Sequence, residues 1–275
     1  MELNTNVIYN ENCVTGMQTH IPDGSVDLII ADPPYNLDKG KRAKYNFDHT
    51  KDKDGVSHKK EVDSNIIQSE NRQWDSFTFD EYIDFSVSWL TEAKRILKPT
   101  GSMWIFGTYH NMGVINVILH QLEYNFINEV IWYKRNATPN LTRRNLTASH
   151  ENLFWISKTK EYTFNYDWTR EGSFPDDSFK NEGKQMRTVW DIHQSKAKDE
   201  TKHGKHPTQK PLSILSRIIQ ISAKPGMVML TPFAGSGSEC VAAKSLGLSY
   251  IGFETSPEYV TLATLRLEDT ACLSQ

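Results

Sequence analysis

The chain has 275 residues, of which 38% are hydrophobic and 24% are charged. Its size favours a single globular domain. No apolar run approaches the roughly 20 residues that cross a bilayer, which excludes a membrane-spanning protein. Residues 1–6 lack the pattern of a secretory signal, and the three scattered cysteines (Cys13, Cys240 and Cys272) indicate neither a disulfide framework nor a zinc site. We therefore expect a cytoplasmic protein without a bound metal.

Charge is unevenly distributed along the chain. The net charge is −3, which by itself argues against a polyanionic partner. Residues 134–205, however, carry fourteen Lys and Arg against ten Asp and Glu, and residues 38–60 carry eight against four. Each of these segments therefore has a net charge of +4, and each is either a solvated surface or a contact surface for a polyanion.

Short apolar runs alternate with stretches of helical periodicity. In chain order, the pattern predicts strands at 26–31, 103–107, 127–133, 152–157, 227–233 and 249–253, and helices at 79–97, 112–122, 212–222 and 238–246. The first helix begins with acidic residues and ends with basic ones, in agreement with the helix macrodipole. Two long segments, 38–73 and 158–207, have no periodicity.

Strands that alternate with helices predict an α/β fold, with a mostly parallel sheet covered by helices on both faces. Ligands bind to such sheets beyond the carboxyl ends of the strands. Motifs that directly follow a predicted strand are therefore the candidates for a functional site.

The first such motif is Asp32-Pro33-Pro34-Tyr35, directly after the strand at 26–31. The two prolines stiffen the backbone as it leaves the sheet, so that the Asp32 carboxylate and the Pro33 carbonyl can point into one small volume. Both groups accept hydrogen bonds, and an exocyclic amino group of a nucleobase has two hydrogens to donate. Tyr35 offers a flat face for stacking, and Asp32 would receive the proton that the nitrogen loses on methylation. The alternative is a strand-ending turn with a surface aspartate.

The second motif, Thr231-Pro232-Phe233-Ala234-Gly235-Ser236-Gly237-Ser238, joins a strand to a helix. Its glycines let the backbone approach a ligand, and the helix N-terminus offers free N–H groups. It is neither the dinucleotide fingerprint GxGxxG nor a P-loop. Glu254 ends the next strand about 20 residues later, where a Rossmann-like site places a carboxylate for ribose hydroxyls. A third motif, Gly-Lys-His-Pro-Thr-Gln-Lys-Pro at 204–211, is rich in donors and could clasp a carboxylate or a phosphate.

In this order, the motifs resemble those of the permuted, β-class amino-methyltransferases of DNA. In that family DPPY comes first, a recognition region follows, and HPTQKP and FxGxG lie near the C-terminus. Further matches at 21–28, 97–102, 136–140, 149–151 and 250–254 extend the resemblance over nearly the whole chain, except 38–73. It implies a Rossmann-like methyltransferase fold with a circularly permuted motif order, in one catalytic domain over 1–275. The methyl donor would be S-adenosylmethionine (SAM).

The resemblance also implies the partners and the site residues. The substrate would be double-stranded DNA with the target base flipped out, and Asp32, Pro33, Pro34 and Tyr35 would form the base pocket. The residues implied at the cofactor are Asn12, His206, Lys210, Thr231, Phe233, Ala234, Gly235, Ser236, Gly237, Ser238 and Glu254. An Asp at the start of DPPY resembles the adenine-N6 members, whereas Ser is commoner in cytosine-N4 members.

Three positions depart from the family pattern. The family usually has Asp where Thr231 stands, and Gly-Asp where this chain has Glu11-Asn12-Cys13, while Ser238 replaces a Thr. The two missing carboxylates would normally meet the methionine amino group and the adenine of the cofactor. Glu11 or Glu239 could compensate, and the sequence does not decide between them.

The basic middle of the chain, about 134–205, is the predicted DNA-recognition region. Its predicted contacts are Lys134, Arg135, Asn136, Arg143 and Arg144, whose side chains suit phosphates and base edges. The insertion at 38–73 leaves from the active-site turn, and we expect a mobile loop that closes over bound DNA. Related enzymes are often dimers, so a homodimer is a further expectation.

The predicted function is site-specific adenine-N6 methylation of DNA, in a restriction–modification system or by a solitary enzyme, in a prokaryotic nucleoid or encoded by a phage. Cytosine-N4 methylation and an RNA target are alternatives. Thr231 and Asn12 suggest a further alternative, a catalytically weak homologue that binds DNA as a partner subunit. An NAD-dependent oxidoreductase is disfavoured because GxGxxG is missing.

Overall fold

The computed structural model describes residues 2–36, 77–137, 139–140, 143–175, 177–194, 199–204 and 206–271. The predicted mobile loop at 38–73 lies outside these residues. No helix in the described part of the chain is long and apolar enough to cross a membrane.

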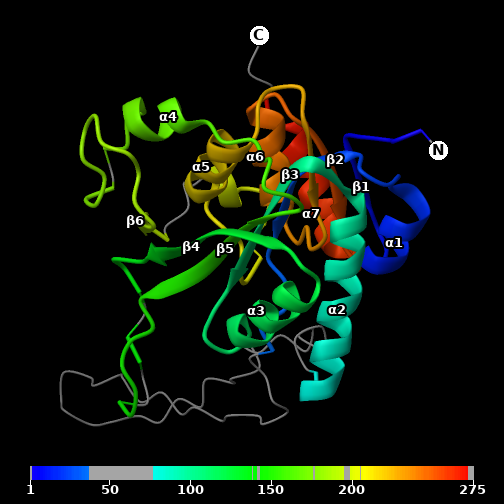
Figure 1. Ribbon diagram of the computed structural model, residues 1–275, viewed down its shortest axis with the longest axis horizontal. Coiled ribbons are helices and arrows are strands. Elements are labelled where there is room, and N and C mark those ends of the chain that lie inside the picture. The colour runs from blue at the N-terminus through cyan, green and yellow to red at the C-terminus, as the bar shows by residue number, and fades with distance from the viewer. Residues whose placement is uncertain are drawn as a thin grey trace, which may run out of the picture.

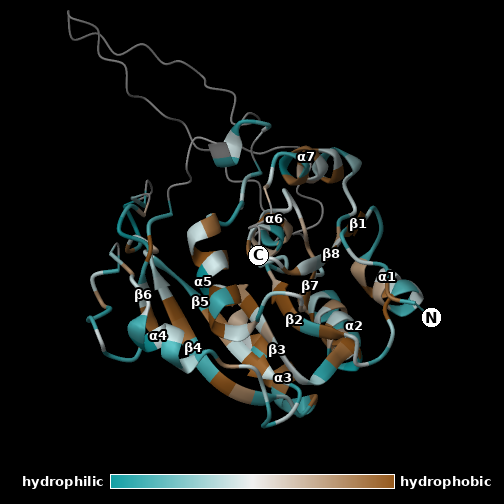
Figure 2. Cartoon of the chain, turned by 90° about the horizontal axis from the view of Figure 1, so that it is seen from above, coloured by the Kyte–Doolittle hydropathy of each residue, from teal (hydrophilic) through white to brown (hydrophobic). Residues whose placement is uncertain are grey.

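Figure 1 follows the chain from its blue N-terminus to its red C-terminus. The described strands form one eight-stranded sheet in the order β1-β8-β7-β2-β3-β5-β4-β6, which can be followed in Figure 2. The strands are β1 (Val7–Tyr9), β2 (Val26–Ala31), β3 (Leu97–Gly107), β4 (Asn125–Tyr133), β5 (His150–Ser157), β6 (Val189–Asp191), β7 (Val228–Thr231) and β8 (Ser249–Phe253). All neighbouring pairs are parallel except those of β5, which runs antiparallel to both β3 and β4. The predicted mostly parallel α/β sheet is therefore confirmed.

Helices cover both faces of the sheet, as Figure 2 shows with the apolar strands between them. On one face lie α1 (Cys13–His20), α2 (Phe79–Ile96) and α3 (Met112–Gln121), and on the other α5 (Leu212–Ser222) and α6 (Ser238–Ser245). Two helices lie further out, α4 (Tyr166–Glu171) against α5 and α7 (Pro257–Glu268) against α6. A short 3-10 turn, Asp199–Thr201, precedes α5.

The central strand β2 shows why the predicted strands read as continuous apolar runs. Leu28 and Ile30 pack into the core under α5 and α6, whereas Ile29 and Ala31 pack into the core under α1, α2 and α3. All four side chains are fully buried. Because side chains alternate between the two faces of a strand, a strand covered on both faces needs apolar residues at every position.

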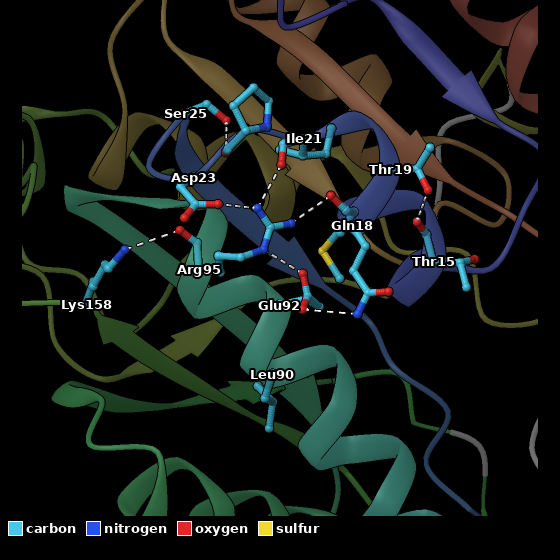
Figure 3. A network of polar contacts seen from close by, with 12 residues as sticks. Thr15, Gln18, Thr19, Ile21, Asp23, Ser25, Leu90, Glu92, Arg95 and Lys158 are labelled. Carbon is cyan, nitrogen blue, oxygen red and sulfur yellow. Dashed lines mark hydrogen bonds and ion pairs between the residues drawn. The ribbon is translucent and has the colours of Figure 1, made fainter. Parts of the chain in front are cut away.

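Arg95, in the last turn of α2, ties that helix to α1 (Figure 3). Its guanidinium donates hydrogen bonds to the backbone carbonyls of Met17 (2.8 Å) and Ile21 (3.0 Å), and it pairs with Asp23 (2.6 Å) and Glu92 (2.7 Å). The cation therefore gives a second donor to the Met17 carbonyl, which already accepts the Ile21 N–H, and a donor to the Ile21 carbonyl just beyond the end of α1. This clamp fixes α1 against the sheet, and the residues before α1 border the candidate site.

Candidate functional site

A cavity of about 940 Å³ lies beyond the carboxyl ends of four parallel strands. Its walls come from the segments that follow β1, β2, β7 and β8, from the loop that precedes α5, and from Phe77 and Phe85 before and within α2. The lining includes Glu11, Asn12, Asp32, Pro33, Pro34, Tyr35, His206, Lys210, Phe233, Ala234, Gly235, Ser236, Ser238, Glu239 and Glu254. The DPPY corner and the glycine turn thus border the same cavity, at the edge of the sheet where the sequence places them.

Two of the predicted cofactor residues do not line this cavity. Thr231 is the last residue of β7, is fully buried, and has a hydroxyl without a hydrogen-bond partner among the described residues. Gly237 caps α6 with φ +73°, and a Cβ at this position would lie 2.7 Å from the Cβ of Ala263. Gly237 therefore permits the close packing of α6 against α7.

Asp32 follows β2 directly and is held by two donors. The Lys210 ammonium donates to Oδ2 at 2.5 Å, and the Tyr35 hydroxyl donates to Oδ1 at 2.7 Å. The hydroxyl of Tyr82, from α2, donates to the Pro34 carbonyl at 3.0 Å and thereby fixes the prolyl corner. Each carboxylate oxygen has a second lone pair, so Asp32 can still accept a hydrogen bond from a substrate.

Lys210 belongs to a buried cluster of alternating charge. Its ammonium lies 3.7 Å from Glu151 Oε2, and Glu151 also forms an ion pair with Lys134 and lies 3.3 Å from the Tyr35 hydroxyl. Burial raises the pKa of Asp32, and Lys210 opposes this rise. Burial alone would also raise the pKa of Glu151, but Lys210 and Lys134 together lower it. Lys210 stays protonated because Asp32 and Glu151 raise its pKa against the effect of burial.

The role of Glu151 and the position of Lys134 were not predicted. Lys134 is buried and its ammonium is paired with Glu151, which does not favour the contact with a DNA phosphate that the sequence analysis predicts. The two residues meet because β4 and β5 pair antiparallel, with Trp132 opposite Glu151. The resemblance marked 149–151 as a match but gave it no role, and the long-range register that brings it to Asp32 has no signal in the sequence.

The glycine turn and Glu254 form the other end of the site. Glu254 follows β8 and accepts the backbone N–H groups of Gly235 and Ser256, each at 2.8 Å. Gly235 adopts φ +48°, and a Cβ there would approach the His206 ring to 3.3 Å. Burial raises the pKa of the Glu254 carboxyl, and the backbone N–H groups of Ser256, Gly235 and Thr255 oppose this rise. The carboxylate keeps lone pairs that can accept two ribose hydroxyls.

The remaining predicted DNA contacts lie at the surface. Arg135, Asn136, Arg143 and Arg144 are exposed. Arg135 pairs with the buried Asp191, and Asn136 accepts the backbone N–H of Gln194. These residues follow the carboxyl end of β4, on the same side of the sheet as the carboxyl ends beyond which the cavity lies.

These residues fit SAM in charge and in shape. Glu254 suits the ribose, the turn at Gly235 lets the backbone approach the ligand, and Phe233 and Tyr259 offer aromatic surface. The lining also holds the carboxylate of Glu239, which can bind a cation, and the carboxylate of Asp32, which is paired with Lys210. Among the described residues, no three His, Cys, Asp or Glu side chains lie close enough together to hold a metal ion.

A Rossmann-like sheet with a DPPY corner and a glycine turn on one cavity is the architecture of a methyltransferase. The family model described as DNA methylase (N6_N4_Mtase) matches residues 26–265. The chain therefore belongs to the N6/N4 DNA methylase family.

Individual proteins agree with this assignment. The type II methyltransferase M.HinfI of Haemophilus influenzae is 37% identical over 272 residues, which cover 96% of this chain and 68% of that protein. The type II methyltransferase M2.DpnII of Streptococcus pneumoniae is 37% identical over 248 residues, covering 89% and 83%. The crystal structure of the M1.HpyAVI–SAM complex has a TM-score of 0.60 at 24% identity, covering 94% of this chain and 98% of that one.

Family membership confirms the predictions of a methyltransferase that acts on DNA and uses SAM as its cofactor. The structural similarity confirms the predicted fold class. The roles of the individual residues stay predictions.

Proposed function

We propose that the chain methylates the N6 amino group of adenine in double-stranded DNA, at a specific sequence, as the modification enzyme of a type II restriction–modification system. One observation carries the proposal: the Asp32 carboxylate, which opens the DPPY motif, lines the same cavity as Gly235 and Glu254. The names of the two relatives that are 37% identical support the assignment to a type II system.

Bound SAM would supply an electrophilic methyl group, and the protein would make the weakly nucleophilic amino nitrogen reactive. The Asp32 carboxylate and the Pro33 carbonyl would accept the two N–H groups of the flipped base, which directs the nitrogen lone pair out of the ring plane. The raised pKa of Asp32 makes its carboxylate a stronger base for the proton that the nitrogen releases. Lys210 and Tyr35 hold that carboxylate in place.

The experiment is transfer of a tritiated methyl group from SAM to genomic DNA that lacks adenine methylation, followed by digestion to nucleosides. We expect the label in N6-methyldeoxyadenosine, at one short sequence that single-molecule sequencing identifies. Label in N4-methyldeoxycytidine would overturn the choice of base. SAM binding without any transfer would favour the partner-subunit alternative.

Asp32→Asn tests the pocket, because it keeps the size of the side chain but does not accept a proton as a carboxylate does. We expect SAM affinity within about threefold of wild type and a single-turnover rate reduced at least about 100-fold, the lower end of general-base contributions. The matched control is Asp27→Asn on the same strand, where Asp27 pairs with Lys98 outside the cavity. Equal transfer by both variants would refute the role of Asp32.

Several finer features belong to the same proposal. We propose that the target base flips out of the duplex and that the protein is a homodimer located in the cytoplasm at the nucleoid. We also propose that DNA is contacted by Arg135, Asn136, Arg143 and Arg144. A gel-filtration mass with and without cognate DNA tests the dimer, and fluorescence of 2-aminopurine at the target position tests flipping.

A further inference from the structure

Glu239 is a buried acid in the wall of the cavity. It is the second residue of α6, directly after the glycine turn, and only 4% of its surface is exposed. Within the described part of the chain, its carboxylate forms no ion pair and no hydrogen bond with another side chain, and it accepts a hydrogen bond from its own backbone N–H. Lys210 and Arg266 attract its charge without forming an ion pair with it, and a buried carboxylate that lacks such a direct contact is costly to ionise. Its position in the cavity wall therefore points to a partner that arrives with the ligand.

The other acids of the cavity wall are already engaged or lie at the rim. Asp32 is held by Lys210 and Tyr35, and Glu254 accepts two backbone N–H groups. Glu11 pairs with His20 at 2.8 Å, and Glu258 is exposed in the first turn of α7. Thr231, at the end of the strand before the glycine turn, has no charge to offer.

Glu239 lies at the Asp32 end of the cavity. Asp32 and Lys210 act on its charge, as does Arg266 from α7, whereas the neighbours of Glu254 are the backbone groups of Gly235, Thr255 and Ser256. If Glu254 takes the ribose, the methionine part of SAM extends toward Glu239 and Asp32. That part carries two positive groups, the sulfonium and the α-ammonium.

The two positive groups differ in what they require. The α-ammonium has N–H donors that need an acceptor, whereas the sulfonium has none. A carboxylate against the sulfonium would stabilise the ground state more than the transition state, in which the positive charge on sulfur declines. The α-ammonium is thus the cation that a buried carboxylate can bind without slowing the transfer.

We propose that Glu239 binds the α-ammonium group of SAM and thereby supplies the acidic contact that Thr231 does not provide. This inference rests on the use of SAM and does not depend on which base is methylated. Of the two acids that could replace the missing carboxylate, Glu11 and Glu239, it selects Glu239.

Burial, followed by the charge of Asp32, raises the pKa of Glu239 to about 7. The charged and titratable groups around it are Asp32 after β2, Lys210 before α5, Arg266 on α7 and Cys240 on α6. A cation that binds only the ionised carboxylate releases a proton below this pKa. SAM affinity should therefore rise between pH 6 and pH 7, where its α-ammonium stays charged because such groups titrate near about 7.7.

The test is calorimetric titration of wild type, Glu239→Gln and Glu11→Gln with three ligands at pH 7. SAM carries both cations, S-adenosylhomocysteine keeps only the α-ammonium, and 5′-methylthioadenosine has neither. We expect Glu239→Gln to weaken SAM and S-adenosylhomocysteine alike by about 10- to 100-fold, as for a lost charged hydrogen bond, and methylthioadenosine by less than about twofold. Glu11→Gln should leave all three affinities within about twofold, and the pH dependence should vanish in Glu239→Gln.

Several outcomes would overturn the inference. Equal weakening of all three ligands would mean a structural role, a loss for SAM alone would mean a contact with the sulfonium, and a loss in Glu11→Gln instead would assign the contact to Glu11. Unchanged affinities in Glu239→Gln would remove the contact altogether. Wild-type protein that binds none of the ligands would contradict the proposed function itself, so the two failures are distinguishable.

Discussion

At the residue scale, Lys210 is the cation on which the buried part of the site depends. Its side chain is only 4% exposed and lies between two carboxylates. In Lys210→Met, Asp32 would be buried without its nearest cation, and Glu151 would keep only Lys134. We expect the free energy of unfolding to fall by about 3–5 kcal/mol at pH 8, as when one partner of a buried pair is removed. Urea unfolding measures this loss.

The pH dependence of this variant has a definite sign. Burial already raises the pKa of Asp32 against the effect of Lys210, so without Lys210 the folded-state pKa of Asp32 would lie still further above its unfolded value and the folded protein would bind protons more tightly. The loss should therefore be smaller at pH 5 than at pH 8. Lys98→Met is the control, because Lys98 forms a partly exposed pair with Asp27 that contributes at most about 1 kcal/mol. A loss that is independent of pH would contradict the charge argument.

At the element scale, α1 depends on α2. The guanidinium of Arg95 donates to the carbonyls of Met17 and Ile21, and no other described side chain donates to them. Arg95→Met should reduce the free energy of unfolding by about 1–3 kcal/mol, since the guanidinium is partly exposed and its ion pairs are screened. Hydrogen exchange should accelerate in α1 more than in α5. In the control Arg170→Met, which removes an exposed pair with Glu171, α1 should exchange at the wild-type rate; equal acceleration in both variants would exclude the clamp.

The elements also show how far the sequence could be read. The strands at 26–31 and 249–253 and the helix at 212–222 were predicted with their observed bounds, and the other three predicted helices end within one residue of the prediction. The strand predicted at 103–107 begins earlier, at Leu97, because β3 pairs with both β2 and β5. The missed strands β1 and β6 have three residues each and lie at the sheet edges, where pairing rather than pattern defines them.

Three helices were missed, α1, α4 and α7, and α1 and α7 differ in what the sequence offered. α7 begins with Pro257 after Ser256, a recognisable start signal that the prediction overlooked. α1 is short and contains Gly16, and it is held by contacts with α2 that the local sequence does not reveal. The parts of the site differ in a similar manner. The motifs after β2, β7 and β8 could be predicted from the sequence because each is one contiguous run of residues. The Glu151–Lys134 pair could not, because only the register of β4 and β5 brings those residues together.

At the scale of the whole molecule, the position of charge matters more than its sum. The net charge is −3, yet the exposed Arg143 and Arg144 lie between the end of β4 and the start of β5. Because β5 runs antiparallel, both of these strand ends lie beside the carboxyl ends of the parallel strands, where the cavity opens. Lys160 follows the other end of β5 and Lys224 precedes β7, so both lie toward the amino ends of the parallel strands, opposite the cavity.

This arrangement predicts which cations displace counterions from DNA. If Arg143 and Arg144 each contact one phosphate, the Arg143→Gln/Arg144→Gln variant should reduce the slope of log K against log salt concentration by about 1.8, at about 0.9 per phosphate. The Lys160→Gln/Lys224→Gln variant makes the same change in net charge at the opposite edge and should leave the slope unchanged. Fluorescence anisotropy with a labelled duplex between 50 and 200 mM salt, roughly the range over which such slopes are read, measures both. Equal slopes in the two variants would mean that DNA responds to total charge and that the cavity edge is not its binding surface.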